Sequence, residues 1–226
     1  MINKKDRISI QVGLSGYSFK IESGDSVRSF GWMSAERLFT TPEFQRRYEE
    51  VEIALFTPKY TLVPSHFHHP LHVRKNLSEV VDLSDGDHVD CVEVPDSAAY
   101  MLFSNSIGET LSKVISETVL KLDGSKASPL PESYYMLNDL RKLQDYNKII
   151  ASYADGYLYL VIAQGKSLLL CNSFPAPDFT TAEYFLFMAM KKLQLNPEVS
   201  TVTFRTPLNE EQEMSLYRYF KNVEQI

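Results

Sequence analysis

The sequence is short of cysteine, of excess positive charge and of long apolar runs, and each shortage excludes a class of protein. The chain of 226 residues has two cysteines, Cys91 and Cys171, so a disulfide framework is excluded and we expect two reduced, buried thiols. The 29 acidic side chains outnumber the 23 basic ones, which argues against a general binder of nucleic acid or anionic membranes. The longest dense apolar run, residues 184–190, is far shorter than the ~20 residues of a membrane span.

The N-terminal residues do not predict export. Residues 1–7 are basic, but the alternating stretch 8–12 follows them in place of the continuous apolar core of a signal peptide. We therefore expect a cytoplasmic protein that binds neither nucleic acid nor membranes and whose partner is another protein.

The chain has enough hydrophobic residues to form a large core. Hydrophobic residues make up 44% of the chain, which holds 13 Phe and 13 Tyr. A chain of this length can bury roughly 70% of its unfolded surface. We expect two compact lobes or one bilobal domain.

The first half of the chain alternates apolar and polar residues as β-strands do. Residues 8–14 and 17–21 predict a hairpin, and residues 27–33 predict a third strand. The sequence Thr41-Pro42-Glu43 places a capping residue, a first-turn proline and an acid together, and so predicts the start of a short helix. Two further strands are predicted at residues 51–56 and 60–63.

The second half repeats this order more clearly. Three apolar runs predict a meander, and Asp155-Gly156, between the first two, is typical of a type I′ hairpin turn. A capping box over residues 180–183 predicts a helix to about Leu195, which is apolar on nearly all sides and should be covered on both faces. The strands are expected at residues 148–153, 157–163, 167–173, 201–204 and 223–226, with a last helix, capped by Asn209, from Glu210 to about Phe220.

The middle of the chain predicts a hairpin over residues 88–104, a helix from about Ile107 and a helix from Pro131 to about Asp145. The domains we expect are a first ribonuclease-H-like unit at 1–84, an intervening segment at 85–146 that completes the first lobe, and a second ribonuclease-H-like unit at 147–226.

The order of three strands, a helix, a strand and a helix is that of the ribonuclease-H-like unit, and two such units in tandem make the actin-like ATPase fold. The expected fold class is therefore α/β, with two tandem ribonuclease-H-like units. The sequence also resembles an uncharacterised Bacteroidetes family whose members are similar to degenerate actin-like proteins. The resemblance rests on residues 8–19, 60–64 and 148–195, and it implies a fold without implying catalytic chemistry.

The resemblance to actin-like ATPases implies phosphate binding between two strand turns, each with glycines and an aspartate. The first turn, residues 13–17, has two glycines and no acid, and Asp155-Gly156 in the second is followed by Tyr157 and Leu158 in place of small and hydroxyl residues. Such ATPases also carry a late glycine pair for adenosine, whereas no glycine follows Gly165 here. We therefore expect no ATP hydrolysis and no cofactor.

The alternative is a divergent nucleotide-binding enzyme, an ATPase or a kinase-like protein, that holds Mg-ATP in the cleft between the lobes. Its candidate nucleotide-binding residues are Ser15, Gly16, Asp155 and Gly156.

Four of the five histidines lie in residues 65–72. If residues 65–76 are helical, His68 and His72 share a face at a spacing that suits a metal ion, although Pro70 disfavours a continuous helix. The other interpretation is a solvent-exposed, histidine-rich loop. The candidate metal ligands are His66, His68, His69 and His72.

Two other catalytic motifs, those of a ribonuclease-H-type nuclease and of a P-loop, are incomplete in this sequence. A ribonuclease-H-type nuclease needs carboxylates on its central strands, and residues 8–14 and 148–153 hold none. The segment Gly165-Lys166-Ser167 is similar to the end of a P-loop, but Leu160 stands where that motif needs its first glycine. The function we expect is a non-catalytic interaction or scaffold module that has lost nucleotide hydrolysis.

Overall fold

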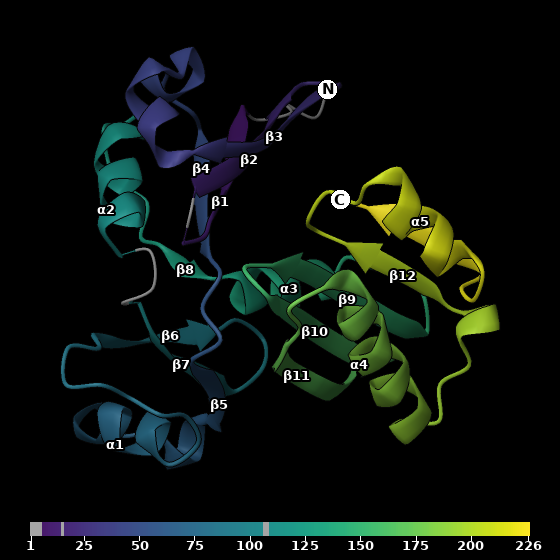
Figure 1. Cartoon of the computed structure of the whole chain (residues 1–226). Helices are drawn as coiled ribbons and strands as arrows, with labels where there is room; N and C mark the ends of the chain where they lie inside the picture. The colour runs from purple at the N-terminus through teal and green to yellow at the C-terminus, as the bar shows by residue number, and fades with distance from the viewer. Residues whose placement is uncertain (1–5, 15, 106–108) are drawn as a thin grey trace. The chain divides into compact units, whose positions relative to one another are not determined.

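The computed structural model describes residues 6–14, 16–105 and 109–226, which fold into two compact units (Figure 1). The first unit contains Met1–Glu93 and Ala99–Pro131, and the second contains Val94–Ala98 and Glu132–Ile226. The chain thus passes from the first unit to the second at residues 131 and 132, between the boundaries at 84 and 146 that we expected. Ser15 and the expected helix start near Ile107 lie outside the described residues.

The first unit is built on a five-stranded mixed sheet whose strand order is β3-β2-β1-β4-β8. Strand β1 pairs antiparallel with β2 and parallel with β4, and β8 continues the parallel half. The predicted hairpin and third strand are confirmed. The bounds are β1 (Arg7–Val12), β2 (Gly16–Ser23), β3 (Ser26–Ser34), β4 (Glu50–Leu55) and β8 (Leu130–Pro131).

One face of this sheet carries an aromatic core that is covered by helical segments. Tyr17, Phe19 and Phe44 pack together there, with the Tyr17 and Phe44 ring centroids 5.2 Å apart. The helix expected after Thr41 is a single short 3-10 helix, Pro42–Gln45. Thr41 makes no capping bond there, because its hydroxyl donates to the Arg37 carbonyl and contacts the Tyr17 hydroxyl. The covering segments are η1 (Ala35–Thr40), η2 (Pro42–Gln45) and α2 (Glu109–Thr118).

A three-stranded sheet is inserted between β4 and α2 of the first unit, in the order β5-β7-β6. Its β6 and β7 are the hairpin predicted from the sequence. The salt bridge between Lys59 Nζ and Asp87 Oδ2, 2.7 Å long, holds the loop before β6 against the loop before β5. The elements are β5 (Tyr60–Pro64), η3 (Ser65–Phe67), η4 (Pro70–His72), α1 (Val73–Ser78), β6 (Val89–Val94) and β7 (Ala99–Ser104).

The sheet of the second unit has the same design, in the order β11-β10-β9-β12-β13. Strand β10 is antiparallel to both β9 and β11, whereas β12 is parallel to β9 and β13. The predicted meander and the two later strands are confirmed, and each unit is ribonuclease-H-like. The bounds are β9 (Asn147–Ala154), β10 (Tyr157–Gln164), β11 (Ser167–Pro175), β12 (Thr201–Phe204) and β13 (Asn222–Gln225).

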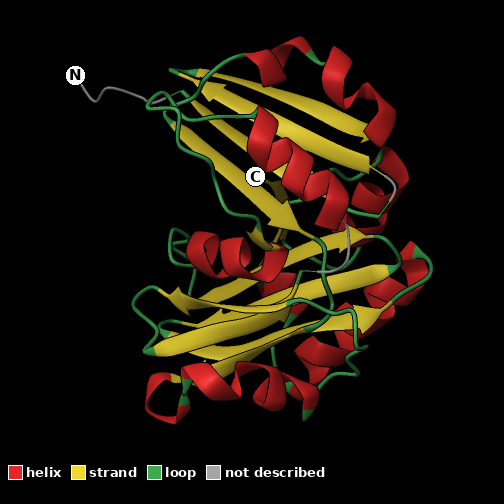
Figure 2. Ribbon diagram, turned by 90° about the vertical axis from the view of Figure 1, so that its left-hand side faces the viewer, coloured by secondary structure: helices red, strands yellow, loops and turns green. Residues whose placement is uncertain are grey.

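Helices cover both faces of the second sheet (Figure 2). Helix α3 (Glu132–Leu140) packs on β9 and β10, whereas α4 (Phe179–Lys192) and α5 (Glu210–Tyr217) contribute to one apolar core on the opposite face. The expectation that α4 is covered all round was wrong, because Tyr184 is 62% exposed. A short 3-10 helix, η5 (Pro197–Val199), precedes β12.

The N-cap of α4 is Asp178, earlier than the capping box predicted over residues 180–183. The Asp178 carboxylate accepts a hydrogen bond from the Thr181 N–H at 2.7 Å. This bond, reinforced by the Thr181 hydroxyl, lowers the pKa of Asp178.

Because the folded pKa of Asp178 is lowered, its contribution to stability is present above the unfolded value of about 3.9 and is lost as pH falls through the folded pKa. An Asp178→Asn variant keeps an acceptor oxygen but does not titrate. We expect the midpoint difference between parent and variant in thermal unfolding to be largest near neutral pH and to shrink as the pH falls below about 4. A difference that stays constant with pH contradicts the prediction.

Both cysteines are reduced thiols, and both are half-buried, so the expectation of buried thiols was wrong. Cys91 lies on β6 and Cys171 on β11, and each of these strands pairs with one other strand among the described residues. Within the described ranges, no helix is long and apolar enough to cross a membrane.

Candidate functional site

The turn between β1 and β2 is the first candidate phosphate-binding turn. The Gly13 N–H donates to the Gly16 carbonyl at 3.0 Å, which closes the turn. A Cβ atom at position 16 would lie 2.0 Å from the Met33 carbonyl oxygen of β3. Gly16 is therefore required by the close approach of β3, whether or not a ligand binds.

The turn between β9 and β10 is the second candidate. Asp155 and Gly156 have φ angles of 51° and 74°, and they are the only residues between the paired Ala154 and Tyr157. Positive φ at both central residues is the requirement of a type I′ turn, so this prediction is confirmed. The Gly156 carbonyl accepts from the Ala176 N–H at 2.7 Å, and this bond ties the turn to the residue after β11.

The segment Gly165-Lys166 is also a hairpin turn, as predicted. It joins β10 to β11 with Gln164 paired to Ser167, and Gly165 has a φ of 54°. The chain continues into a strand and not into a helix. This segment therefore does not direct the N–H groups of a helix N-terminus at a phosphate, as a P-loop does.

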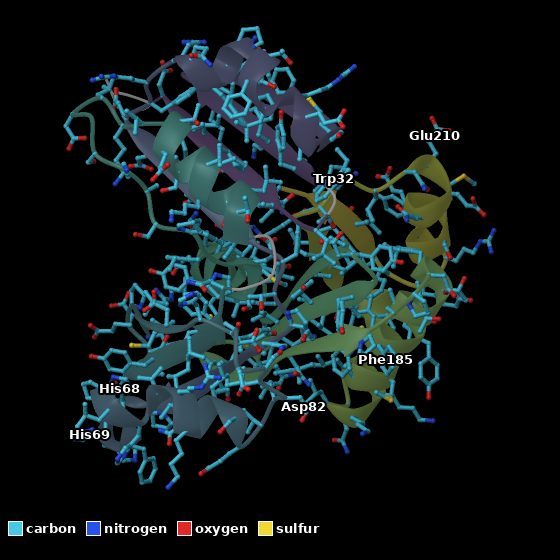
Figure 3. The ribbon with its side chains drawn as sticks, turned by 60° about the vertical axis from the view of Figure 1, so that its left-hand side comes forward. Trp32, His68, His69, Asp82, Phe185 and Glu210 are labelled. Atoms are coloured by element: carbon cyan, nitrogen blue, oxygen red, sulfur yellow. The ribbon has the colours of Figure 1, made fainter. Side chains whose placement is uncertain are left out.

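The histidine segment is not one helix. His68 and His69 adopt extended backbone angles between η3 and η4, which separates His68 and His72 onto different elements. Figure 3 labels His68 and His69 at the end of the first unit that carries this segment. His68 stacks on Tyr100 with ring centroids 3.9 Å apart, and His69 Nδ1 accepts from the Leu71 N–H. Over the described part of the chain, no three His, Cys, Asp or Glu side chains form a group that could hold a metal ion.

The structure contains a buried charge cluster in the second unit that sequence reasoning missed. Arg205 follows β12, and its Nη1 and Nε atoms lie 2.9 Å from Glu132 Oε2 and 2.9 Å from Asp139 Oδ2 respectively. Glu132 Oε1 accepts from the Ser152 hydroxyl at 2.6 Å. We call these four residues the Arg205 cluster.

Local structure explains why these side chains converge. Glu132 and Asp139 are seven residues apart on α3, so they share one helix face. The Arg205 N–H donates to the Ala151 carbonyl at 3.0 Å, which continues the β9–β12 pairing by one residue and points Arg205 to the same side as Thr203. The guanidinium carbon also lies 5.6 Å from the Tyr135 ring centroid.

The charged side chains of this cluster are removed from water, so they need partners of opposite charge. The side chains of Glu132, Arg205 and Asp139 are 0%, 8% and 14% exposed. Burial also raises the pKa of nearby Tyr159 well above its usual value, and the charges of Asp155 and Glu132 raise it further. The cluster clamps α3 to β9 and β12, and its carboxylates neutralise Arg205.

A comparison with solved structures identifies the fold. A Bacteroides thetaiotaomicron VPI-5482 protein, described as having an actin-like ATPase fold and unknown function, is similar with a TM-score of 0.68 and 16% identity over 99% of this chain and 91% of that one. A structure described as the PilM-PilN type IV pilus biogenesis complex is similar with a TM-score of 0.52 and 14% identity over 97% and 88%.

At these identities the likeness shows the fold alone, and it confirms an actin-like fold made of two ribonuclease-H-like units. No curated protein matches the chain. The model of one protein family matches residues 2–223, nearly the whole sequence. The chain therefore belongs to the family described as Protein of unknown function (DUF3822).

Proposed function

We propose that this chain is a protein-binding module that keeps the actin-like fold and does not hydrolyse nucleotide. The observation that carries the proposal is that Gly16 and Gly156, the glycines of the two candidate phosphate turns, both serve strand packing. Gly16 gives room to the Met33 carbonyl, and Gly156 completes a type I′ turn that is tied to Ala176.

The Arg205 cluster supports the same proposal. A carboxylate that assists phosphoryl transfer must reach a magnesium ion or a water molecule. Glu132 has no exposed surface, and its two oxygens contact Ser152 and Arg205. These contacts stabilise α3 on its sheet and engage both oxygens of the carboxylate, which supports a structural role for Glu132.

A protein partner is supported by one of the similar folds. The solved PilM structure is described as a complex with PilN, so a protein of this architecture assembles with another protein. Extended strand edges and exposed aromatic side chains such as Trp32 and Tyr184 give this chain surfaces of the kind that partners bind.

The proposal is tested by calorimetric titration of the purified chain with magnesium ATP and with ADP. We expect no binding heat at millimolar nucleotide and no phosphate release above the buffer rate. The matched variant is Asp155→Asn, because asparagine tolerates the positive φ at position 155 and removes the charge. Stoichiometric binding at micromolar affinity that the variant loses would overturn the proposal and establish Mg-ATP as a ligand.

A further inference from the structure

Negative charge is concentrated in one short segment of the first unit and its neighbouring turn. Residues 79–96 contain seven acidic side chains and no Lys or Arg, while the formal charge of the whole chain is -6. The formal charge of this segment, -7, is therefore larger in magnitude than the net charge of the whole chain. Its acids are Glu79, Asp82, Asp85, Asp87, Asp90, Glu93 and Asp96.

Most of these acidic side chains have no ion-pair partner among the described residues. Asp87 is paired with Lys59, and Asp96 lies 3.6 Å from Arg141. The side chains of Asp82, Asp85, Asp90 and Glu93 are exposed, and none of them forms an ion pair with a described residue.

The strand β6 in the middle of this segment is an edge strand. Its one strand neighbour within the described ranges is β7. The Asn105 N–H donates to the His88 carbonyl, so residue 88 and every second residue after it direct their backbone groups toward β7. The N–H and C=O groups of Val89, Cys91 and Glu93 therefore point away from the sheet.

Strand β6 has six residues and no proline. Its outward Cys91 N–H donates to Asp90 Oδ1 at 2.8 Å, a bond to an exposed side chain that an incoming strand would have to displace. Charged side chains on an edge strand discourage other strands from pairing with it. Four exposed acids of one sign make an exception for a partner of the opposite sign and disfavour a partner of the same sign.

We propose that the β6 edge binds an extended segment of another protein that carries several Lys or Arg residues and adds to the sheet as a further strand. The inference rests on the proposed function and names the chemistry of its partner. Six residues at about 3.3 Å each make an edge of about 20 Å, which a partner segment of similar length would cover. Main-chain hydrogen bonds would supply binding, and Asp90, Glu93 and the acids before β6 would select the basic residues.

Cys91 makes this edge directly observable. In a Cys171→Ser variant it is the sole thiol, and it lies in the middle of β6. The probe is a capped six-residue peptide of alternating lysine and valine, with affinity measured by calorimetry and Cys91 alkylation measured by mass spectrometry. We expect the peptide to slow alkylation at least fivefold and its affinity to fall as NaCl is raised from 50 to 500 mM.

One control peptide and three sets of chain variants separate strand addition from simple charge attraction. A peptide in which proline replaces valine keeps the charge but cannot form a strand, and we expect it to bind at least tenfold more weakly. A Val89→Pro variant removes an outward N–H and no charge, whereas Asp90→Asn with Glu93→Gln removes charge and keeps the edge. Each should weaken binding at least fivefold, while Glu210→Gln, an exposed acid of the second unit, should not.

The proposal is overturned if millimolar peptide leaves Cys91 unprotected, if the proline peptide binds equally well, or if Cys91 is shielded by self-association of the chain without peptide. Should Val89→Pro not fold, the charge variants and the proline peptide still decide the question. Nucleotide titration is independent of this edge, so a failure here with no ATP binding rejects the β6 partner and leaves the non-hydrolysing module standing.

Discussion

Replacing Arg205 by methionine is expected to destabilise the second unit by about 3–5 kcal/mol. Methionine retains much of the volume of the side chain but removes the charge that Glu132 and Asp139 both contact at 2.9 Å. The fully buried Glu132 carboxylate would then lack its counter-charge. Urea unfolding followed by circular dichroism measures the change.

Two further variants isolate the charge effect. Arg218→Met removes an exposed arginine just after α5 and should change the free energy of unfolding by less than about 0.5 kcal/mol. Adding Glu132→Gln and Asp139→Asn to Arg205→Met should recover part of the lost stability, because no unpaired buried charge remains. If Arg205→Met alone stays within about 1 kcal/mol of the parent, the Arg205 cluster does not clamp α3 to the sheet.

Gly16→Ala is expected to be the other severe substitution, with a loss of about 3 kcal/mol or complete failure to fold. The added Cβ would lie 2.0 Å from the Met33 carbonyl oxygen, closer than real Cβ atoms approach other atoms. Strand β3 would have to move away from β2, and the packing of Phe30 on Phe19, with centroids 4.2 Å apart, would suffer.

Gly31→Ala is the matched control, because it lies on β3 close to Met33 and a Cβ there has open space around it. It should be neutral within about 0.5 kcal/mol. Thermal unfolding of the two variants gives the comparison. If Gly16→Ala is as stable as the parent, the glycine is not needed for packing. That result would favour the alternative, in which this turn binds a ligand.

Local patterns in the sequence were sufficient to predict most of the secondary structure and the order of the units. Apolar alternation predicts β1 to β3, and three dense aromatic and branched runs predict β9 to β11. The turn at Asp155-Gly156 was predictable because few residue pairs adopt two positive φ angles without strain. These features depend on interactions between residues that are neighbours in the chain.

The features that bear on function depend on residues that are distant in the chain. Glu132 and Arg205 are separated by 73 positions. The residues next to each of them in the sequence do not predict that the two form an ion pair. From the sequence, Gly16 is a candidate for a phosphate-binding turn. The structure shows that β3 approaches it too closely for a larger residue. Likewise, the acids of residues 79–96 resemble an ordinary solvated stretch until strand pairing leaves β6 at an edge.

The sequence by itself determined the two ribonuclease-H-like units and argued against ATP hydrolysis, because periodicity and missing motif residues are properties of the chain alone. Only the tertiary structure decided which glycines are needed for packing, which charges are paired and which strand edges are bonded to another strand. Close approach, burial and strand pairing each require a partner from elsewhere in the chain. In this protein Gly16, Gly156 and Glu132 each contact such a partner, whereas no described strand pairs with the outer edge of β6.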